Sequence, residues 1–361
     1  MSALRVVVLG LSITSSWGNG HATNFRALVR ALHGRGHDVL FLERDVPWYA
    51  EHRDLPSPPW GRTALYGSLE QLRDEHGAAV READLVVVGS YVPEGADAGR
   101  WVQETARGVT AFYDIDTPVT LAALARGECD YLVPELVAGY DLYLSFTGGP
   151  TLTYLEDVLG SPRARAFHCL VDEAAYAPVD VERRWALGYL GTWSADRQPV
   201  LDELLVQAAR ALGEEAFVVA GPQYPGDIAW PDNVARIEHL PPAEHVAFYS
   251  AQRLTLNVTR ADMVRAGWSP SVRLFEAAAC GVPVVSDWWE GLDAFFVPGE
   301  EVLVARSAAE VVEHLGDTDE ERRAELGAAA RRRVLARHTA EHRADELEAH
   351  VAAVREAAVR P

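Results

Sequence analysis

The residues best suited to chemistry lie in Gly267–Gly299, which reads GWSPSVRLFEAAACGVPVVSDWWEGLDAFFVPG. A polar loop leads into a helical segment that carries Arg273 and Glu276, and a buried strand follows it. The N-terminus of a helix offers unpaired amides and a partial positive charge to a diphosphate. A carboxylate one or two turns further on can accept hydrogen bonds from ribose hydroxyls. The pattern therefore predicts a nucleotide-binding helix that begins near Ser271.

A polar loop with two glycines follows the apolar run Leu4–Leu9, which reads LRVVVL. Gly18 and Gly20 permit close approach of the backbone to a ligand, and the imidazole of His21 can act as a base or as a hydrogen-bond donor. Ligands of open α/β sheets bind at the carboxyl ends of strands, so we expect this loop to face one. A structural turn with a solvent-exposed histidine is the alternative.

An acidic pair follows another strand-like run, at Asp114 and Asp116, and Pro118 prevents the strand from continuing. Two aspartates at this spacing could hold a divalent cation on a diphosphate, or one of them could serve as a catalytic base. The alternative is that they cap the helix expected at Val119–Leu124.

The elements that position these loops alternate between strands and helices. Val-rich and Leu-rich strands that alternate with helices predict parallel sheets covered on both faces, a doubly wound Rossmann-type fold. In the first half we expect strands at Leu4–Leu9, Asp38–Leu42, Leu85–Val88, Thr110–Tyr113 and Leu142–Phe146, with helices such as Thr23–Leu32 and Leu69–Arg81. From Ala186 the pattern restarts with LGYLG, a helix at Pro199–Leu212, and then FVVAG, ARIEHL, LTLNV and PVVSD.

Two domains follow from this repetition. We expect an N-terminal domain at 1–172, a second domain at 186–335 and a C-terminal helix at 336–361. The linker is expected at about His168–Arg184, where a proline and several acidic residues interrupt the periodicity.

Composition excludes several classes of protein. The 361 residues include 33 basic and 53 acidic side chains, a formal net charge of -20, which disfavours binding to nucleic acids and to anionic membrane surfaces. Every basic residue is arginine, so an anion site must rest on guanidinium groups or backbone amides. The three cysteines show no metal or disulfide spacing, and no window is apolar enough to span a membrane, so we expect a cytoplasmic protein without a transmembrane segment.

The stretch Ser271–Asp287 resembles the donor-site helix of family-4-like glycosyltransferases of the GT-B fold. Together with YDIDTP at 113–118 and GYLGTWSADR at 188–197, it resembles the spore-maturation (CgeB-type) branch. The resemblance implies two Rossmann-like domains that face an interdomain cleft, with a C-terminal helix that crosses back to the first domain. It also implies a nucleotide-sugar donor held mostly by the second domain, and an acceptor, a small molecule or a glycan, held by the first.

The resemblance also implies roles for single residues. Glu276 matches the glutamate that binds the donor ribose, and Arg197 matches the arginine that faces the donor phosphates. The lysine that usually follows this arginine is absent, so Arg260, Arg265 and Arg273 are the candidates for a second cation. The remaining residues expected at the donor site are Gly191, Gly221, Pro222, Leu240 and Ser271. Ser269 stands where the family places a glutamate, which leaves the identity of the sugar open.

The predicted function is transfer of a sugar from a nucleoside diphosphate to a hydroxyl or amine, without a metal or other cofactor; the resemblance implies retention of configuration, as in many family-4-like enzymes. The metal-free course is favoured because the second half carries a nucleotide site that needs no cation. A retaining reaction needs no protein base, whereas an inverting reaction would use His21, Asp114 or Asp116. The alternatives are a metal-dependent Asp-x-Asp transferase and a non-catalytic nucleotide- or sugar-binding protein of the same fold. The sequence does not indicate an oligomeric state.

Overall fold

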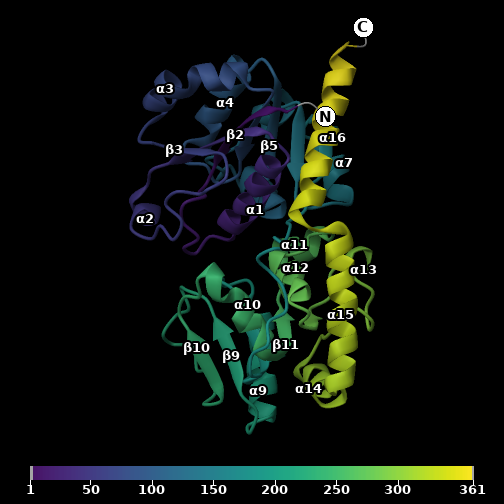
Figure 1. Cartoon of the computed structure of the whole chain (residues 1–361). Coiled ribbons are helices and arrows are strands. Elements are labelled where there is room, and N and C mark those ends of the chain that lie inside the picture. The colour runs from purple at the N-terminus through teal and green to yellow at the C-terminus, as the bar shows by residue number, and fades with distance from the viewer. Residues whose placement is uncertain (1–2, 360–361) are drawn as a thin grey trace. The chain divides into compact units, whose positions relative to one another are not determined.

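Two compact units make up the protein in a computed structural model that describes residues 3–359. Unit 1 comprises the described parts of Met1–Leu170 and Ala340–Pro361, and unit 2 comprises Val171–Thr339. Each unit contains one parallel sheet, as the alternation of strands and helices predicts (Figure 1). No helix within residues 3–359 is both long enough and apolar enough to cross a membrane.

The sheet of unit 1 has the order β3-β2-β1-β4-β5-β6-β7 in the described part of the chain. Its strands are β1 (Arg5–Gly10), β2 (Asp38–Arg44), β3 (Arg62–Tyr66), β4 (Leu85–Gly89), β5 (Val109–Asp114), β6 (Leu142–Ser145) and β7 (Ala164–Ala166). Its helices are α1 (Gly20–Gly34), α2 (Pro47–Ala50), α3 (Leu69–Glu82), α4 (Gly95–Thr105), α5 (Thr117–Arg126), α6 (Pro134–Gly139), α7 (Pro150–Asp157) and α16 (Ala340–Val359). Every residue of β4 and β5 is buried, so both faces of the sheet are covered.

The sheet of unit 2 has the order β10-β9-β8-β11-β12-β13. Its strands are β8 (Trp185–Leu190), β9 (Phe217–Ala220), β10 (Val234–Ile237), β11 (Gln252–Asn257), β12 (Val284–Ser286) and β13 (Leu303–Val304). Its helices are α8 (Gln198–Leu201), the π-helical turn η1 (Asp202–Val206), α9 (Gln207–Ala211), α10 (Pro242–Ser250), α11 (Ala261–Ala266), α12 (Val272–Ala279), α13 (Leu292–Phe295), α14 (Ala308–Asp317) and α15 (Glu320–Arg337).

Each sheet has a point at which the strand order reverses. In unit 1 this switch point lies between β1 and β4, and in unit 2 it lies between β8 and β11. Doubly wound sheets bind ligands outside the carboxyl ends of their strands at such a point. The loops after β1 and β8 therefore lie where ligands are expected, and both contain residues that the sequence singles out.

The last helix belongs to unit 1 although the residues before it belong to unit 2. Helix α16 packs against α1, and the guanidinium of Arg35 reaches three carboxylates on it, those of Glu341, Asp345 and Glu348. Arg343 is 1% exposed and donates from Nε to the carbonyl of His168 at 2.9 Å. These contacts make α16 an integral part of unit 1.

The structure contains three strands that the sequence does not predict, and one predicted helix is interrupted. Strands β3, β7 and β13 lie at the edges of their sheets and lack an apolar run, because an edge strand has one strand neighbour and less buried surface. The helix expected at Pro199–Leu212 consists of α8, η1 and α9 in succession, so its middle turn is π-helical.

Candidate functional site

Two glycines bring the loops after β8 and β9 together at the carboxyl edge of the second sheet. The amide of Gly191 donates to the carbonyl of Ala220 at 2.9 Å. Gly221 has a φ of +141°, and a Cβ on it would lie 2.0 Å from the carbonyl oxygen of Gly191. Only glycine fits there, because an added Cβ would collide with backbone that cannot move aside. The carbonyl of Pro222 accepts from the amide of Trp193 at 3.0 Å, so these predicted residues share one edge.

Arg197 lies just before α8 and closes the loop that follows β8. Its Nε donates to Ser194 Oγ at 2.8 Å, and its Nη2 donates to the carbonyl of Thr192 at 2.6 Å. A guanidinium has five N–H donors, and these two bonds leave others for a phosphate at the same edge.

Arg260 contacts this loop from the other side of the switch point, in the short loop between β11 and α11. Its Nε lies 3.8 Å from Asp196 Oδ2, which also accepts from the amide of Ala261 at 3.0 Å. The Nε of Arg260 is buried and has no hydrogen-bond partner among the described residues. Arg197 and Arg260 thus lie on the two loops of the switch point, beside the place where an anion is expected.

Arg273, in the first turn of α12, is 7% exposed and fixes the two central strands. It donates from Nε to the carbonyl of Leu190 and from Nη1 to Asn257 Oδ1 at 2.8 Å. Ser271 Oγ donates to the same oxygen at 2.7 Å. A Cβ on Gly191 would lie 2.8 Å from Arg273 Nη2, so this guanidinium lies directly below the glycine loop.

Glu276, one turn further along α12, is 4% exposed and lies among residues of α10. Its Oε2 accepts from the hydroxyl of Tyr249 at 3.0 Å and lies 3.9 Å from His245 Nδ1. The other ring nitrogen of His245 lies 3.2 Å from the carbonyl oxygen of Leu240. The imidazole therefore lies between the two predicted donor residues, Leu240 and Glu276, and its Nδ1 is 3.0 Å from the hydroxyl of Tyr176. Burial and the charge of Glu276 raise the pKa of Tyr249 well above its usual value, which keeps the hydroxyl a donor.

Arg236 in β10 is a candidate that the sequence analysis misses. Its Nη2 donates to the carbonyl of Gly221 at 3.0 Å, and its guanidinium lies 4.0 Å from the ring centre of Tyr224 and 5.1 Å from that of Trp230. Burial lowers the pKa of Arg236 from its usual value. The one sign in the sequence that Arg236 belongs to the donor edge is the presence of an arginine inside the strand ARIEHL.

The remaining candidates near α12 differ in their surroundings. Arg265 pairs with Asp262 on the surface of α11 and is 70% exposed. Ser269 is fully buried and donates from Oγ to the carbonyl of Gly267 at 2.7 Å. Trp268, which directly precedes Ser269, has a φ of +42°, a strained value for a bulky residue, and its amide donates to the carbonyl of Glu290 at 2.6 Å.

In unit 1 a buried carboxylate shapes the loop after β1. Glu43, in β2, is fully buried, and its Oε2 accepts from the amides of both Ile13 and Thr14, at 2.7 and 3.0 Å. The hydroxyls of Ser12 and Thr14 donate to it as well, at 3.1 and 2.6 Å. Four hydrogen bonds to one carboxylate hold this loop in a single conformation.

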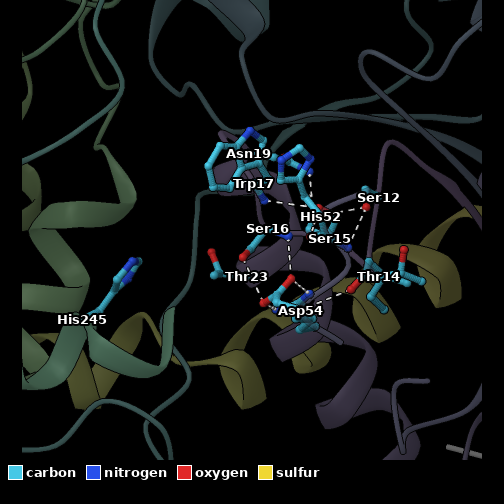
Figure 2. A network of polar contacts seen from close by, with 12 residues as sticks. Ser12, Thr14, Ser15, Ser16, Trp17, Asn19, Thr23, His52, Asp54 and His245 are labelled. Carbon is cyan, nitrogen blue, oxygen red and sulfur yellow. Dashed lines mark hydrogen bonds and ion pairs between the residues drawn. The ribbon is translucent and has the colours of Figure 1, made fainter. Parts of the chain in front are cut away.

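Figure 2 shows the continuation of this loop beside Asp54 and His52. Ser16 donates to Asp54 from its amide and its hydroxyl, at 2.8 and 3.0 Å, and Arg26 binds the same carboxylate through both Nη atoms. Burial raises the pKa of Asp54, but the bonds from Arg26 and Ser16 outweigh it and lower the value to about 2. Trp17 stacks on His52 with ring centres 4.3 Å apart.

His21 and Asp116 come together at the carboxyl edge of the first sheet. Gly18 has a φ of +59°, and Asn19 caps α1 by accepting from the amide of His21 at 2.9 Å; Gly20 is the first residue of that helix. His21 Nε2 lies 3.7 Å from Asp116 Oδ2, and its Nδ1 is buried without a hydrogen-bond partner among the described residues. The two predicted loops therefore meet, and they place an imidazole beside a carboxylate.

Asp114 lies two residues before Asp116 but in different surroundings. It is fully buried and accepts from the hydroxyls of Tyr143 and Thr120 at 2.6 and 2.8 Å and from the amide of Asp116 at 3.2 Å. Burial raises the pKa of Asp114 to about 6 despite these bonds. The carboxyl group holds the loop that presents Asp116. Among the described residues, no group of three or more histidine, cysteine or acidic side chains could hold a metal ion.

The pKa of Asp114 predicts how the stability of unit 1 depends on pH. The folded state holds a proton up to about pH 6, whereas an unfolded aspartate loses it near 3.8, so the contribution of this group to stability falls as pH rises from about 4 to 6. The variant Asp114→Asn lacks this titration, so it should gain stability relative to the parent over that range, by roughly 2 to 3 kcal/mol at most. Urea unfolding of both proteins at pH 4.5 and 7 measures the difference, and a gap that does not change with pH would contradict the assignment.

Comparison with known proteins adds a family for much of unit 2. Residues 197–349 match the family described as glycosyl transferase-like. This match gives the chain a glycosyltransferase domain, as the donor-helix pattern predicts. None of the curated proteins compared with the chain matches it.

Solved structures resemble nearly the whole chain. A sucrose-phosphate synthase from Thermosynechococcus elongatus is 16% identical, with a TM-score of 0.70 over 98% of this chain and 99% of that one. HepE from Anabaena in complex with UDP and glucose is 13% identical, with a TM-score of 0.69 over 97% and 99%. An alpha-glucosyltransferase in complex with UDP-glucose and DNA containing an abasic site is 12% identical, with a TM-score of 0.71 over 97% and 100%. The predicted fold class, GT-B, is confirmed by these likenesses.

Proposed function

We propose that this protein transfers a sugar from a uridine diphosphate donor to an acceptor hydroxyl or amine in the cytoplasm. The observation that carries the proposal is the gathering of Gly191, Arg197, Gly221, Arg273 and Glu276 around the switch point of the second sheet. The choice of uridine draws on the solved neighbours whose complexes contain UDP or UDP-glucose. The motifs at 113–118 and 188–197 support a place in the spore-maturation branch.

The diphosphate and the ribose of the donor each have partners in this arrangement. Arg197 and Arg260 face the diphosphate from the two switch-point loops, and the amides at the start of α12 add a partial positive charge. Glu276 accepts from the ribose hydroxyls, while the hydroxyl of Tyr249 donates to its carboxylate and holds it in place. The charge that develops on the leaving diphosphate is thereby stabilised by fixed groups that do not need to reorganise.

Unit 1 supplies the acceptor side, through His21 and the loop that Glu43 shapes. Asp116 acts as a positioning residue for the imidazole, and Asp114 supports the loop from inside the fold. The acceptor is not a nucleic acid in this proposal, since a chain with a net charge of -20 repels a phosphate backbone.

The family resemblance supports retention of configuration, with the departing phosphate as the group that takes the acceptor proton. One observation favours a second course. His21 lies 3.7 Å from Asp116, the arrangement of a general base with an acidic partner, and such a base would give inversion. The anomeric configuration of the product, read by NMR, decides between the two.

The test of the function is turnover of a nucleotide sugar by the full chain. We expect slow release of UDP from a UDP-sugar in water, and faster release once an accepted hydroxyl or amine is present. Binding of UDP without release from any nucleotide sugar would instead indicate a non-catalytic binding protein. Failure to bind any nucleoside diphosphate would overturn the donor site itself.

Chelation should leave the reaction unchanged. Arginines and helix amides offset the charge of the leaving group in this proposal, so no divalent cation is required. Turnover measured with and without excess EDTA should agree. Loss of turnover in EDTA that manganese or magnesium restores would favour the metal-dependent Asp-x-Asp course.

A further inference from the structure

Unit 2 contains a pocket at the edge of its sheet opposite the donor loops. The pocket has a volume of about 270 Å³ and lies at the amino ends of the strands, beside Gln252, the first residue of β11, and Pro283, which precedes β12. Gly191, Arg197 and Arg260 follow the carboxyl ends of strands in the same parallel sheet. The two sites therefore lie at opposite edges, and the function proposed above makes no use of this one.

Four arginines line the pocket: Arg183, Arg253, Arg323 and Arg331. No acidic side chain is part of the lining in the described part of the chain. Two carboxylates pair with these arginines from outside the lining, Glu320 with Arg183 and Arg323, and Glu215 with Arg253. The four guanidinium groups and the two carboxylates that pair with them carry a net charge of about plus two, although the chain as a whole is strongly acidic.

Several polar atoms beside the pocket lack a protein partner. The side chain of Arg323 is 12% exposed, and its Nε is buried with no hydrogen-bond partner among the described residues. Ser250 Oγ and Gln252 Oε1 are likewise buried and unpartnered there, and Gln252 is 1% exposed. Unpaired buried polar groups are costly to the fold; of these three, the Nε of Arg323 and the hydroxyl of Ser250 are donors, the type that an anion needs, whereas Gln252 Oε1 only accepts.

The rest of the wall is apolar and neutral. Pro178, Val179, Val282 and Ala328 contribute apolar surface. Burial, with the charge of Glu276 adding to it, raises the pKa of Cys280 to about 12, so this residue lines the pocket as a neutral thiol. Helix α15 packs closely on the turn after α12, because a Cβ on Gly327 would meet the carbonyl oxygen of Gly281 at 2.0 Å.

We propose that this pocket binds a small phosphate monoester, whose phosphate pairs with the arginines and whose organic part lies on the apolar wall. A phosphate monoester carries close to two negative charges at neutral pH, which matches the excess of two guanidinium groups. Guanidinium groups bind phosphate oxygens through paired, charge-assisted hydrogen bonds. Free inorganic phosphate has a similar charge, but it has no organic part to cover the apolar wall.

Calorimetry on the full chain tests the proposal, with phenyl phosphate, inorganic phosphate and benzoate as probes. We expect phenyl phosphate to bind at least about tenfold more tightly than either of the others, because only it satisfies both halves of the pocket. Equal affinity for the two phosphates would identify free phosphate as the ligand and overturn the monoester. Failure of phenyl phosphate to bind at millimolar concentration would overturn the site.

Variants locate the binding. Two variants should each weaken the binding of phenyl phosphate by about tenfold or more: Arg323→Ala and, separately, Ala328→Glu. The second places a carboxylate at an exposed position of the lining. The matched controls on α15 are Arg332→Ala and Ala336→Glu, at exposed positions outside the lining, and they should leave the affinity unchanged. Ala328→Glu keeps the test valid if Arg323→Ala fails to fold. Loss of binding in Arg197→Ala, with none in Ala328→Glu, would place the anion at the donor edge and overturn the proposal.

Discussion

Alanine in place of His21 should lower turnover by at least about 10²-fold, while the affinity for UDP changes by less than about twofold. The imidazole lies beside Asp116 at the edge of the first sheet, whereas the nucleotide contacts proposed here lie in unit 2. Loss of a base costs about 10²- to 10⁴-fold in turnover, and loss of one hydrogen bond to a developing charge costs about 10²- to 10³-fold. Steady-state kinetics with saturating donor and acceptor measure the loss, and calorimetry with UDP measures the affinity.

His33→Ala is the matched control, since His33 lies exposed in the last turn of the same helix, α1. Asp116→Asn should lower turnover less than His21→Ala, because the carboxylate acts through the imidazole. Inversion in the product of the parent enzyme would identify His21 as the base. If His21→Ala turns over at the parent rate, the contribution of unit 1 to the reaction comes from other residues.

Glu276→Ala should weaken the binding of UDP by about 1 to 3 kcal/mol, which corresponds to roughly 5- to 150-fold in Kd. The carboxylate is proposed to accept the hydroxyls of the ribose, and a neutral methyl group cannot replace that charge-assisted interaction. Glu276→Gln, which retains the shape, should show a smaller loss in the same direction. Calorimetry with UDP provides the affinities.

Two further variants separate binding from folding. Tyr249→Phe removes the hydroxyl that bonds to Glu276 inside the protein and should affect stability more than UDP affinity. Glu244→Gln, an exposed carboxylate on α10, should change neither. An unchanged Kd for UDP in a folded Glu276→Ala protein would refute the assignment of this residue to the ribose.

Much of the fold could be predicted, because its central strands are marked by local patterns in the sequence. Apolar runs such as LRVVVL mark the central strands, because a strand buried on both faces cannot carry many polar residues. The glycine pair of the donor edge is also visible locally, since Gly191 and Gly221 each end such a run. The edge strand β3 (Arg62–Tyr66) was missed because its side chains are only partly buried and carry no such run.

The site is less visible because its groups meet through tertiary contacts. Glu43 is about thirty residues from the amides of Ile13 and Thr14 that it binds, and nothing near it in the sequence indicates a loop support. His245 lies between Leu240 and Glu276 only once α10 packs beside α12. Asp114 and Asp116 look equivalent in the sequence, yet the strand end buries the first fully and the turn leaves the second partly exposed.

The place of α16 in unit 1 has a consequence for the order in which the protein folds during synthesis. Arg35 and the carbonyl of His168 find their partners on a helix that the ribosome adds after all of unit 2. At about 5 to 20 residues per second, the wait is on the order of ten to thirty seconds. The second unit can therefore complete its fold before the first, the reverse of their order along the chain, and the first unit needs the last helix of the chain to close its own core.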